Sequence, residues 1–289
     1  MPTTTNSAWR DSWGYEMTNY TIDKDIVFGT GAGRPLSCDV YKPSTGTETG
    51  LIFLHGGGFT GGSKDGMTER VGHYASLGYT CIVAEYRLAG EAKWPAQIHD
   101  AKAAIRWGRA NAASLKINPT KVCIGGFSAG GLIALVAAGS PDMPGLEGEG
   151  GNDGVSSKVA ACVAYYPAIE IGPRADGAGH PLMPIGSREP AYRSARPTTY
   201  VSPNFAPTIL FHGTADTTVP LDSSQRFFKT LRAEGVATEL HAFDNLYHIF
   251  DRYPELGAST AAIGDMFLRR TVVNPRVYAP FDVPAPATT

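Results

Sequence analysis

Short hydrophobic runs and helix-like segments alternate along most of the chain. Apolar residues at helical spacing, such as Ile98, Ala101 and Ile105, predict helices over Gln97–Ala112, Ala129–Ala138, Ser223–Glu234 and Ala258–Arg270. Runs rich in β-branched and aromatic residues predict strands over Leu36–Tyr41, Leu51–Leu54, Thr80–Ala84, Val122–Ile124, Ala160–Tyr165, Thr208–Phe211 and Thr238–Phe243. Strands that are apolar on both faces and separated by helices predict a mostly parallel sheet flanked by helices. The expected fold class is α/β, with ligands bound at the carboxyl ends of the strands.

Two segments do not follow this alternation. Residues 1–24 are largely polar, and we expect them to form an N-terminal extension. Residues 168–206 are rich in proline, glycine and arginine and show little periodicity. Loops of this length inside a compact domain are usually functional or disordered, and we interpret this one as a small lid insertion over the active site. Residues 1–289 are expected to form a single domain that includes both segments.

Composition and charge exclude several classes of protein. The chain has 289 residues, of which 43% are hydrophobic, and this is enough for one large core. The formal net charge of -2, without a basic stripe, argues against a nucleic-acid partner. No apolar run is long enough to span a membrane or to act as a signal peptide, so a cytoplasmic protein is expected.

The four cysteines lie in strand-like runs without the spacing of metal ligands. We interpret them as small buried hydrophobic residues, although adjacent strands could bring two of them together in a disulfide. They are Cys38, Cys81, Cys123 and Cys162.

A glycine-rich turn after the strand Val122–Ile124 has the pattern of a nucleophile elbow. The turn reads Gly126-Phe127-Ser128-Ala129-Gly130 and precedes an apolar helix. A sharp strand–turn–helix connection leaves no room for side chains beside the serine, and it exposes the hydroxyl near a helix N-terminus. Ser128 is therefore the candidate nucleophile; a glycine-rich connection with a capping serine is the alternative interpretation.

A second glycine-rich loop follows the strand Leu51–Leu54 and reads His55-Gly56-Gly57-Gly58. Acyl transfer places negative charge on a carbonyl oxygen, and backbone N–H groups of residues without side chains can approach that oxygen closely. Gly57, Gly58 and Ala129 are the candidate oxyanion donors. His55 is expected to shape the loop through hydrogen bonds rather than to act as a base. A phosphate-binding loop would need a lysine and a helix that this segment lacks.

A serine hydroxyl needs a histidine to accept its proton and an acid to orient that histidine. In hydrolases of this topology the chain order is serine, acid, histidine. Asp216 lies on a turn just past the strand Thr208–Phe211, and His248 lies on a loop past the strand Thr238–Phe243. They are the candidate acid and base; Asp222 is the rival acid, and it has the position of a helix N-cap.

With these residues in place, the chain resembles the hormone-sensitive-lipase-like branch of the α/β-hydrolases over roughly residues 38–270. The matching motifs are His55-Gly56-Gly57-Gly58-Phe59, Glu85-Tyr86-Arg87-Leu88, Trp94-Pro95-Ala96 with Asp100, Gly126–Gly131, His212–Pro220 and Tyr247-His248. The resemblance implies a serine esterase with the triad Ser128, Asp216 and His248 and with no cofactor or metal. The long helical N-terminal cap of that branch is missing, so the chain is more similar to compact acetyl, feruloyl and xylan-directed esterases.

We therefore predict hydrolysis of small esters with short acyl chains, including acetyl or hydroxycinnamoyl esters. An amidase or formamidase similar to kynurenine formamidase, and a non-catalytic small-molecule receptor, are the alternative functions. A homodimer stays open as the assembly. The predicted walls of the substrate pocket are Phe59, Phe127, Tyr166, Pro167, Val219 and Tyr247.

Overall fold

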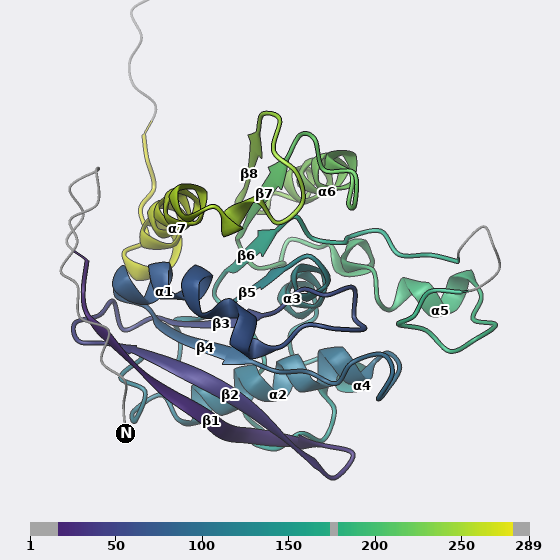
Figure 1. The fold of residues 1–289 in the computed structure, drawn as a ribbon, viewed down its shortest axis with the longest axis horizontal. Coiled ribbons are helices and arrows are strands. Elements are labelled where there is room, and N and C mark those ends of the chain that lie inside the picture. Colours follow the sequence, from purple (N-terminus) through teal and green to yellow (C-terminus); the bar gives the residue numbers. More distant parts are fainter. Residues whose placement is uncertain (1–16, 174–178, 280–289) are drawn as a thin grey trace, which may run out of the picture.

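The computed structural model describes residues 17–173 and 179–279 and contains one eight-stranded sheet with helices on both faces (Figure 1). Along the sheet the strands lie in the order β1-β2-β4-β3-β5-β6-β7-β8. β1 pairs with β2, and β2 with β4, in antiparallel fashion; every other pair is parallel. The strands are β1 (Tyr20–Gly31), β2 (Arg34–Pro43), β3 (Gly50–Leu54), β4 (Thr80–Ala84), β5 (Val122–Phe127), β6 (Cys162–Tyr165), β7 (Thr208–Gly213) and β8 (Thr238–Phe243).

The α-helices and the shorter helical turns connect these strands. The α-helices are α1 (Thr68–Ser76), α2 (Ala96–Ala110), α3 (Ala129–Gly139), α4 (Pro144–Glu147), α5 (Glu189–Arg193), α6 (Leu221–Ala233) and α7 (Pro254–Leu268). The other helical turns are η1 (Lys64–Met67), η2 (Pro197–Tyr200), η3 (Phe250–Arg252) and η4 (Arg269–Val273).

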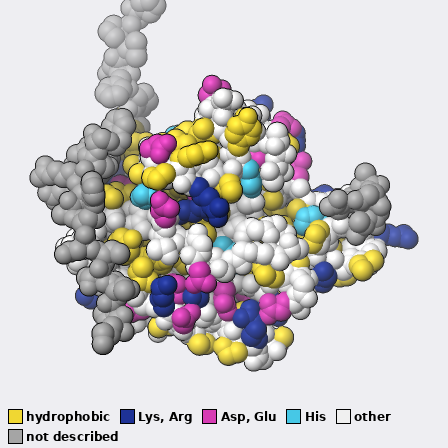
Figure 2. Space-filling view, in the orientation of Figure 1, with side chains coloured by type: hydrophobic (Ala, Val, Ile, Leu, Met, Phe, Trp, Pro, Cys, Tyr) yellow, Lys and Arg dark blue, Asp and Glu magenta, His cyan; other side chains and the backbone are white. Residues whose placement is uncertain are grey.

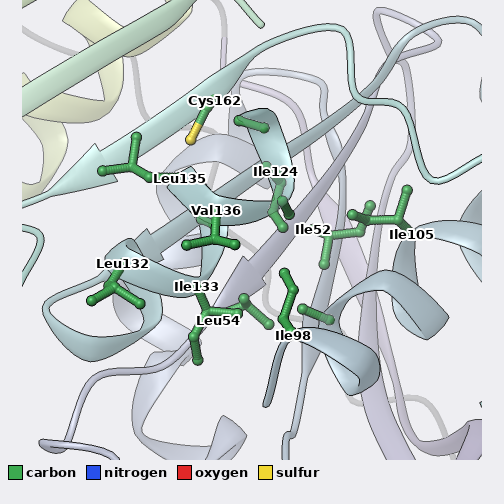
Figure 3. Close-up of a cluster of buried hydrophobic side chains, with 14 of the residues drawn as sticks. Ile52, Leu54, Ile98, Ile105, Ile124, Leu132, Ile133, Leu135, Val136 and Cys162 are labelled. Atoms are coloured by element: carbon green, nitrogen blue, oxygen red, sulfur yellow. The ribbon is translucent and has the colours of Figure 1, made fainter. Parts of the chain in front are cut away.

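The central strands bury both of their faces in two separate hydrophobic cores. In β3, Ile52 and Leu54 pack toward α2 and α3, whereas Leu51 and Phe53 pack toward α1 and α7. Figure 3 shows the first core, where Ile98 and Ile105 of α2 meet β3 and the apolar residues of α3. Because successive side chains of a strand point to opposite faces, an uninterrupted apolar run is what a doubly covered strand requires. The expected α/β fold, with a mostly parallel sheet flanked by helices, is confirmed.

The N-terminal boundary needs correction. We expected residues 1–24 to form an extension, but β1 begins at Tyr20 and pairs with β2 along most of its length. Lys24, Asp25, Val27 and Thr30 of β1 are exposed, as expected for an edge strand, and the register shifts between Asp23 and Ile26. That irregularity interrupts the period-two pattern that marks a strand, and this is why the sequence did not reveal it. Residues 1–16 lie outside the described part of the chain.

The cysteines match their expected environment. All four are free and buried. Burial raises the pKa of the Cys38 thiol and of the Cys123 thiol, each to about 12, so both are protonated at neutral pH. The disulfide that the sequence left open is not formed.

The insertion 168–206 contains α5 and η2 and packs against the segment that precedes α2 (Figure 1). The N–H of Trp94 donates to the carbonyl of Leu182, and the Trp94 indole N–H donates to the hydroxyl of Ser194. Leu182 and Tyr192 are fully buried. Residues 174–178 of this insertion lie outside the described part of the chain.

Candidate functional site

Five loops meet at the carboxyl edge of the parallel strands. The register pairs Leu54 of β3 with Gly126 of β5, and Phe127 of β5 with Tyr165 of β6. The same alignment continues to β7 and β8, so the residues that directly follow these strands lie along one edge. Segments that are distant in sequence are therefore brought to one site by the parallel register alone.

Ser128 occupies a strained turn between β5 and α3. Its φ is 53°, in a region that non-glycine residues rarely adopt, and its own N–H donates to the carbonyl of Tyr165 at 2.9 Å. A Cβ on Gly126 would lie 2.2 Å from the carbonyl oxygen of Gly130. A Cβ on Gly130 would lie 2.3 Å from the carbonyl oxygen of Leu54. Both glycines are therefore needed for the turn that presents the serine hydroxyl.

The structure brings Ser128, His248 and Asp216 together in one hydrogen-bonded series. His248 Nε2 lies 3.0 Å from Ser128 Oγ, and His248 Nδ1 lies 2.6 Å from Asp216 Oδ2. Because a carboxylate only accepts, Nδ1 carries the hydrogen, and Nε2 is left to accept the serine proton. The ring of Tyr166 packs edge-on against the His248 ring, with their centroids 4.6 Å apart.

The Asp216 carboxylate is buried and fully engaged. Its Oδ1 accepts the N–H groups of Thr218 and Val219 at 2.9 and 2.8 Å. Its Oδ2 also lies 3.3 Å from Nε2 of His212, which donates to the carbonyl of Val219 at 2.7 Å. Burial lowers the pKa of His212, which favours its neutral imidazole beside Asp216.

The rival acid, Asp222, lies elsewhere. It is in the first turn of α6 and pairs with Arg226 on the surface. The residue at the N-cap of α6 is Pro220, so the predicted N-cap role of Asp222 is wrong. The helix begins at Leu221 because the proline fits the extended conformation that precedes a first turn.

Three backbone N–H groups close to Ser128 have no hydrogen-bond partner among the described residues. Within the described residues, no hydrogen bond is donated by the N–H groups of Gly57, Gly58 and Ala129. Gly57 has a φ of 126°, and a Cβ there would lie 2.2 Å from the carbonyl oxygen of Gly61. This loop can therefore present N–H groups to a carbonyl oxygen placed beside Ser128.

His55 shapes the loop in the way that the sequence suggested. Its Nδ1 donates to the carbonyl of Gly56 at 2.8 Å, and its ring stacks on Tyr86 with centroids 4.3 Å apart. Burial lowers the pKa of His55, which keeps the imidazole neutral and inside the protein.

A cavity of about 370 Å³ opens beside Ser128. Of the six predicted wall residues, Phe127 and Tyr166 line it. The remaining lining residues are His55, Gly56, Gly57, Gly58, Gly62, Ser63, Gly66, Met67, Arg70, Ser128, Thr218, His248, Ile249 and Arg252.

The other four predicted wall residues need correction because they do not line this cavity. Phe59 is 2% exposed and packs edge-on against His180. Pro167 lies against Gly131. The backbone N–H of Val219 donates to Asp216, and its carbonyl accepts from His212. Tyr247 is 64% exposed and lines an adjoining hollow. Position next to a motif residue did not predict these orientations, because side chains of consecutive turn residues point in different directions.

The sequence missed Met67, Arg70, Ile249 and Arg252 as wall residues. Met67 and Arg70 come from η1 and α1, which cover the site from a segment with no catalytic motif. The spacing of Met67, Val71, Tyr74 and Ala75 is the signal that could have located the missed helix α1.

Metal-binding clusters and membrane-spanning helices are two further features that bear on function. In the ranges 17–173 and 179–279, no group of three His, Cys, Asp or Glu side chains is placed to hold a metal ion. None of the helices described is both long and apolar enough to cross a membrane.

Comparison with known proteins places these features among related sequences. A family model described as BD-FAE matches residues 38–231. The protein LipM of Mycobacterium tuberculosis (strain ATCC 25618 / H37Rv), named a probable carboxylic ester hydrolase, is 31% identical over 252 residues. The match covers 79% of this chain and 58% of LipM, so the chain spans less than two thirds of that relative.

Solved structures of an esterase from the Planctomycetes species Thermogutta terrifontis are also similar. Its native form superimposes with a TM-score of 0.75 at 27% identity, over 87% of this chain and 94% of that one. A propionate-bound form of the same esterase gives a TM-score of 0.74 at 27% identity, over 88% of this chain and 96% of that one.

Proposed function

The chain belongs to the BD-FAE family of α/β-hydrolases, and from this premise we propose that it is a serine carboxylesterase acting on small, short-acyl esters. Ser128 is the nucleophile, His248 the general base and acid, and Asp216 the residue that orients His248. The observation that carries the proposal is the unbroken series from Ser128 Oγ through His248 to Asp216, with separations of 3.0 and 2.6 Å.

The first half of the reaction acylates the serine. Ser128 Oγ attacks the ester carbonyl carbon, and its proton moves to Nε2 of His248. The carbonyl oxygen becomes an oxyanion that accepts hydrogen bonds from the N–H groups of Gly57, Gly58 and Ala129. When the intermediate collapses, the bond to the alcohol oxygen breaks, and that oxygen takes the proton from His248.

The second half releases the acid. A water molecule gives a proton to His248 Nε2 while its oxygen attacks the acyl carbon. Collapse of this second oxyanion breaks the bond to Ser128 Oγ, which regains the proton. Throughout, Asp216 Oδ2 accepts the Nδ1 hydrogen and stabilises the imidazolium form.

The short-acyl preference rests on the size of the cavity and on one relative. A volume of about 370 Å³ suits a compact substrate, and Met67, Phe127 and Ile249 supply apolar wall. The esterase of Thermogutta terrifontis has been solved with propionate bound, which is consistent with a short acyl group at this type of site.

Hydrolysis of 4-nitrophenyl acetate tests the proposal, with 4-nitroacetanilide as the matched amide. The wild-type protein should hydrolyse the ester, and Ser128→Ala should lower kcat/KM by on the order of 10⁴-fold or more with an unchanged circular dichroism spectrum. An amide cleaved faster than the ester would identify an amidase instead. Equal activity of Ser128→Ala and wild type would contradict the assignment of the nucleophile.

A further inference from the structure

The cavity beside Ser128 carries positive charge. Two arginines, Arg70 and Arg252, line it, and none of its described lining residues is Asp or Glu. On the face seen in Figure 2, Lys or Arg side chains gather near the middle of the molecule, with a histidine close to them. The ester-cleaving chemistry described above uses neither arginine, so their presence calls for another reason.

Arg70 is buried but keeps an unused donor. Its side chain is 9% exposed, and Nε pairs with Oδ2 of Asp251 at 3.0 Å. The guanidinium lies over the Phe127 ring, 5.0 Å from the centroid. Its Nη2 is buried and has no hydrogen-bond partner among the residues described. A buried donor left unpaired is costly, so an acceptor on a bound molecule would relieve this cost.

Asp251 pairs with Arg70 without accepting a hydrogen bond from Nη2. Its Oδ1 accepts the hydroxyl of Tyr166, whereas its Oδ2 makes no hydrogen bond within the described residues although it lies 3.0 Å from Nε of Arg70; Asp251 is 4% exposed. Asp251 therefore positions the guanidinium of Arg70 through Nε. It is not itself one of the residues that line the cavity. This ion pair positions Arg70 and leaves Nη2 without a hydrogen bond among the described residues.

Arg252 adds a second positive charge at the mouth. It ends η3, is exposed, and forms no ion pair with any described residue. It lines both the Ser128 cavity and the adjoining hollow of about 580 Å³, whose lining includes one carboxylate, Glu255. Arg252 interacts electrostatically with Asp251, but its exposed guanidinium forms no ion pair within the described residues and is available to a ligand at the junction of the two hollows.

We propose that the ester hydrolysed at this site carries a carboxylate group, which Arg70 and Arg252 bind. This inference rests on the proposed esterase function and adds the charge of its substrate. A carboxylate can accept from two guanidinium groups at once, and hydrogen bonds to charged groups are the stronger kind. The carboxylate belongs either to the acyl half of the ester or to its alcohol half, and both place the same anion near the two arginines.

Two matched pairs of esters test the proposal and distinguish the two halves. Monomethyl succinate and methyl pentanoate differ in a carboxylate on the acyl half. The pair 4-acetoxybenzoate and 4-methylphenyl acetate differ in a carboxylate on the alcohol half. We expect kcat/KM to favour the anionic member of one pair, and Arg252→Gln to reduce that preference roughly 10-fold. The preference should also weaken as the salt concentration rises.

Arg232→Gln is the matched control. Arg232 is an exposed arginine in the last turn of α6, outside the residues that line the cavity, so this variant should keep the wild-type preference. Arg70→Lys should reduce the preference further. Because that variant also alters the ion pair with Asp251, the result for Arg252→Gln is the decisive one. A wild-type preference that Arg252→Gln leaves unchanged, or no preference in either pair, would overturn the proposal.

Binding to the Ser128→Ala protein separates this inference from the esterase function itself. Calorimetry should show tighter binding of the anionic ester than of its neutral partner, and a second change, Arg252→Gln, should remove the difference. Equal binding together with Ser128-dependent hydrolysis of the neutral ester would reject the anion preference and leave the esterase function standing. Selective binding without any hydrolysis by the wild type would support anion recognition and reject the esterase function.

Discussion

Two glycines determine how Ser128 is presented. Gly126 and Gly130 lie on either side of it, and a Cβ added to either glycine would clash with a backbone carbonyl oxygen. This crowding could be predicted from the sequence, because a strand, a sharp turn and a helix within a few residues leave no room for side chains. The left-handed conformation of Ser128 itself follows from the same geometry.

Gly126→Ala should therefore reduce both stability and activity. The new Cβ would meet the Gly130 carbonyl at 2.2 Å, and the resulting overpacking should lower the free energy of unfolding by about 1–3 kcal/mol. Displacement of the turn should lower kcat/KM for 4-nitrophenyl acetate roughly 100-fold. Urea unfolding and steady-state kinetics measure the two effects.

The matched control is Gly90→Ala. A Cβ at Gly90 meets nothing within 4 Å, so stability and activity should stay close to those of the wild type. If Gly126→Ala behaved like this control, the crowding at the turn would not be what selects glycine there.

At the scale of elements, the sequence predicted the inner strands better than the outer ones. β3, β4 and β5 are buried on both faces. Their uninterrupted apolar runs are typical of a central strand of a covered sheet or of a buried helix. β1 is an edge strand with a shifted register, so its pattern is weaker. The residues of the cavity wall on η1 and η3 come from segments without motifs, and only the packed structure shows that they reach Ser128.

Some predictions about elements remain predictions. Described residues of the insertion 168–206 pack beside α2 and contribute none of the residues that line the Ser128 cavity. That the insertion acts as a lid stays a prediction, because its segment 174–178 lies outside the described residues.

An ion pair joins Arg87, in the segment that follows β4, to Asp100 of α2. Asp100 is 1% exposed and accepts from Nε and Nη2 of Arg87 at 2.9 and 2.8 Å, and from the Arg87 backbone N–H at 2.8 Å. Asp100→Ala should lower the free energy of unfolding by about 3–5 kcal/mol, because the Arg87 guanidinium, whose side chain is 13% exposed, loses its counter-charge. Urea unfolding measures this loss.

Asp222→Ala provides the comparison, because Asp222 pairs with Arg226 at the surface of α6. Exposed pairs contribute under about 1 kcal/mol, so this variant should remain close to wild type. Equal losses in the two variants would show that the Asp100 pair does not hold α2 in place.

At the scale of the whole molecule, several histidines are kept neutral by burial. Burial lowers the pKa of His55, His73 and His212 below the ordinary value of about 6.5. Below that value the unfolded chain takes up protons that the folded protein does not bind. Stability should therefore fall as the pH drops from 7 through 6.5 and on toward the lowered pKa values, by up to about 1.4 kcal/mol per pH unit for each group.

His73→Leu tests this dependence. Nε2 of His73 is buried and has no hydrogen-bond partner among the described residues, so the substitution breaks no hydrogen bond at that atom. Free energies of unfolding measured between pH 7 and 5.5 should fall less steeply in the variant than in the wild type. Glu69 and Asp251 interact electrostatically with His73, so the difference between the two slopes reports His73 together with its effect on these two carboxyl groups. Identical slopes would contradict the account.

The central claim is that one serine, activated through His248 and Asp216, forms the covalent intermediate. Labelling with a fluorophosphonate, followed by digestion and peptide mass spectrometry, tests it most directly, because the probe reacts only with an activated nucleophile. We expect a single adduct on the peptide that contains Ser128, and a loss of labelling in His248→Ala by at least about 100-fold. An adduct on another residue, or undiminished labelling without His248, would contradict the claim.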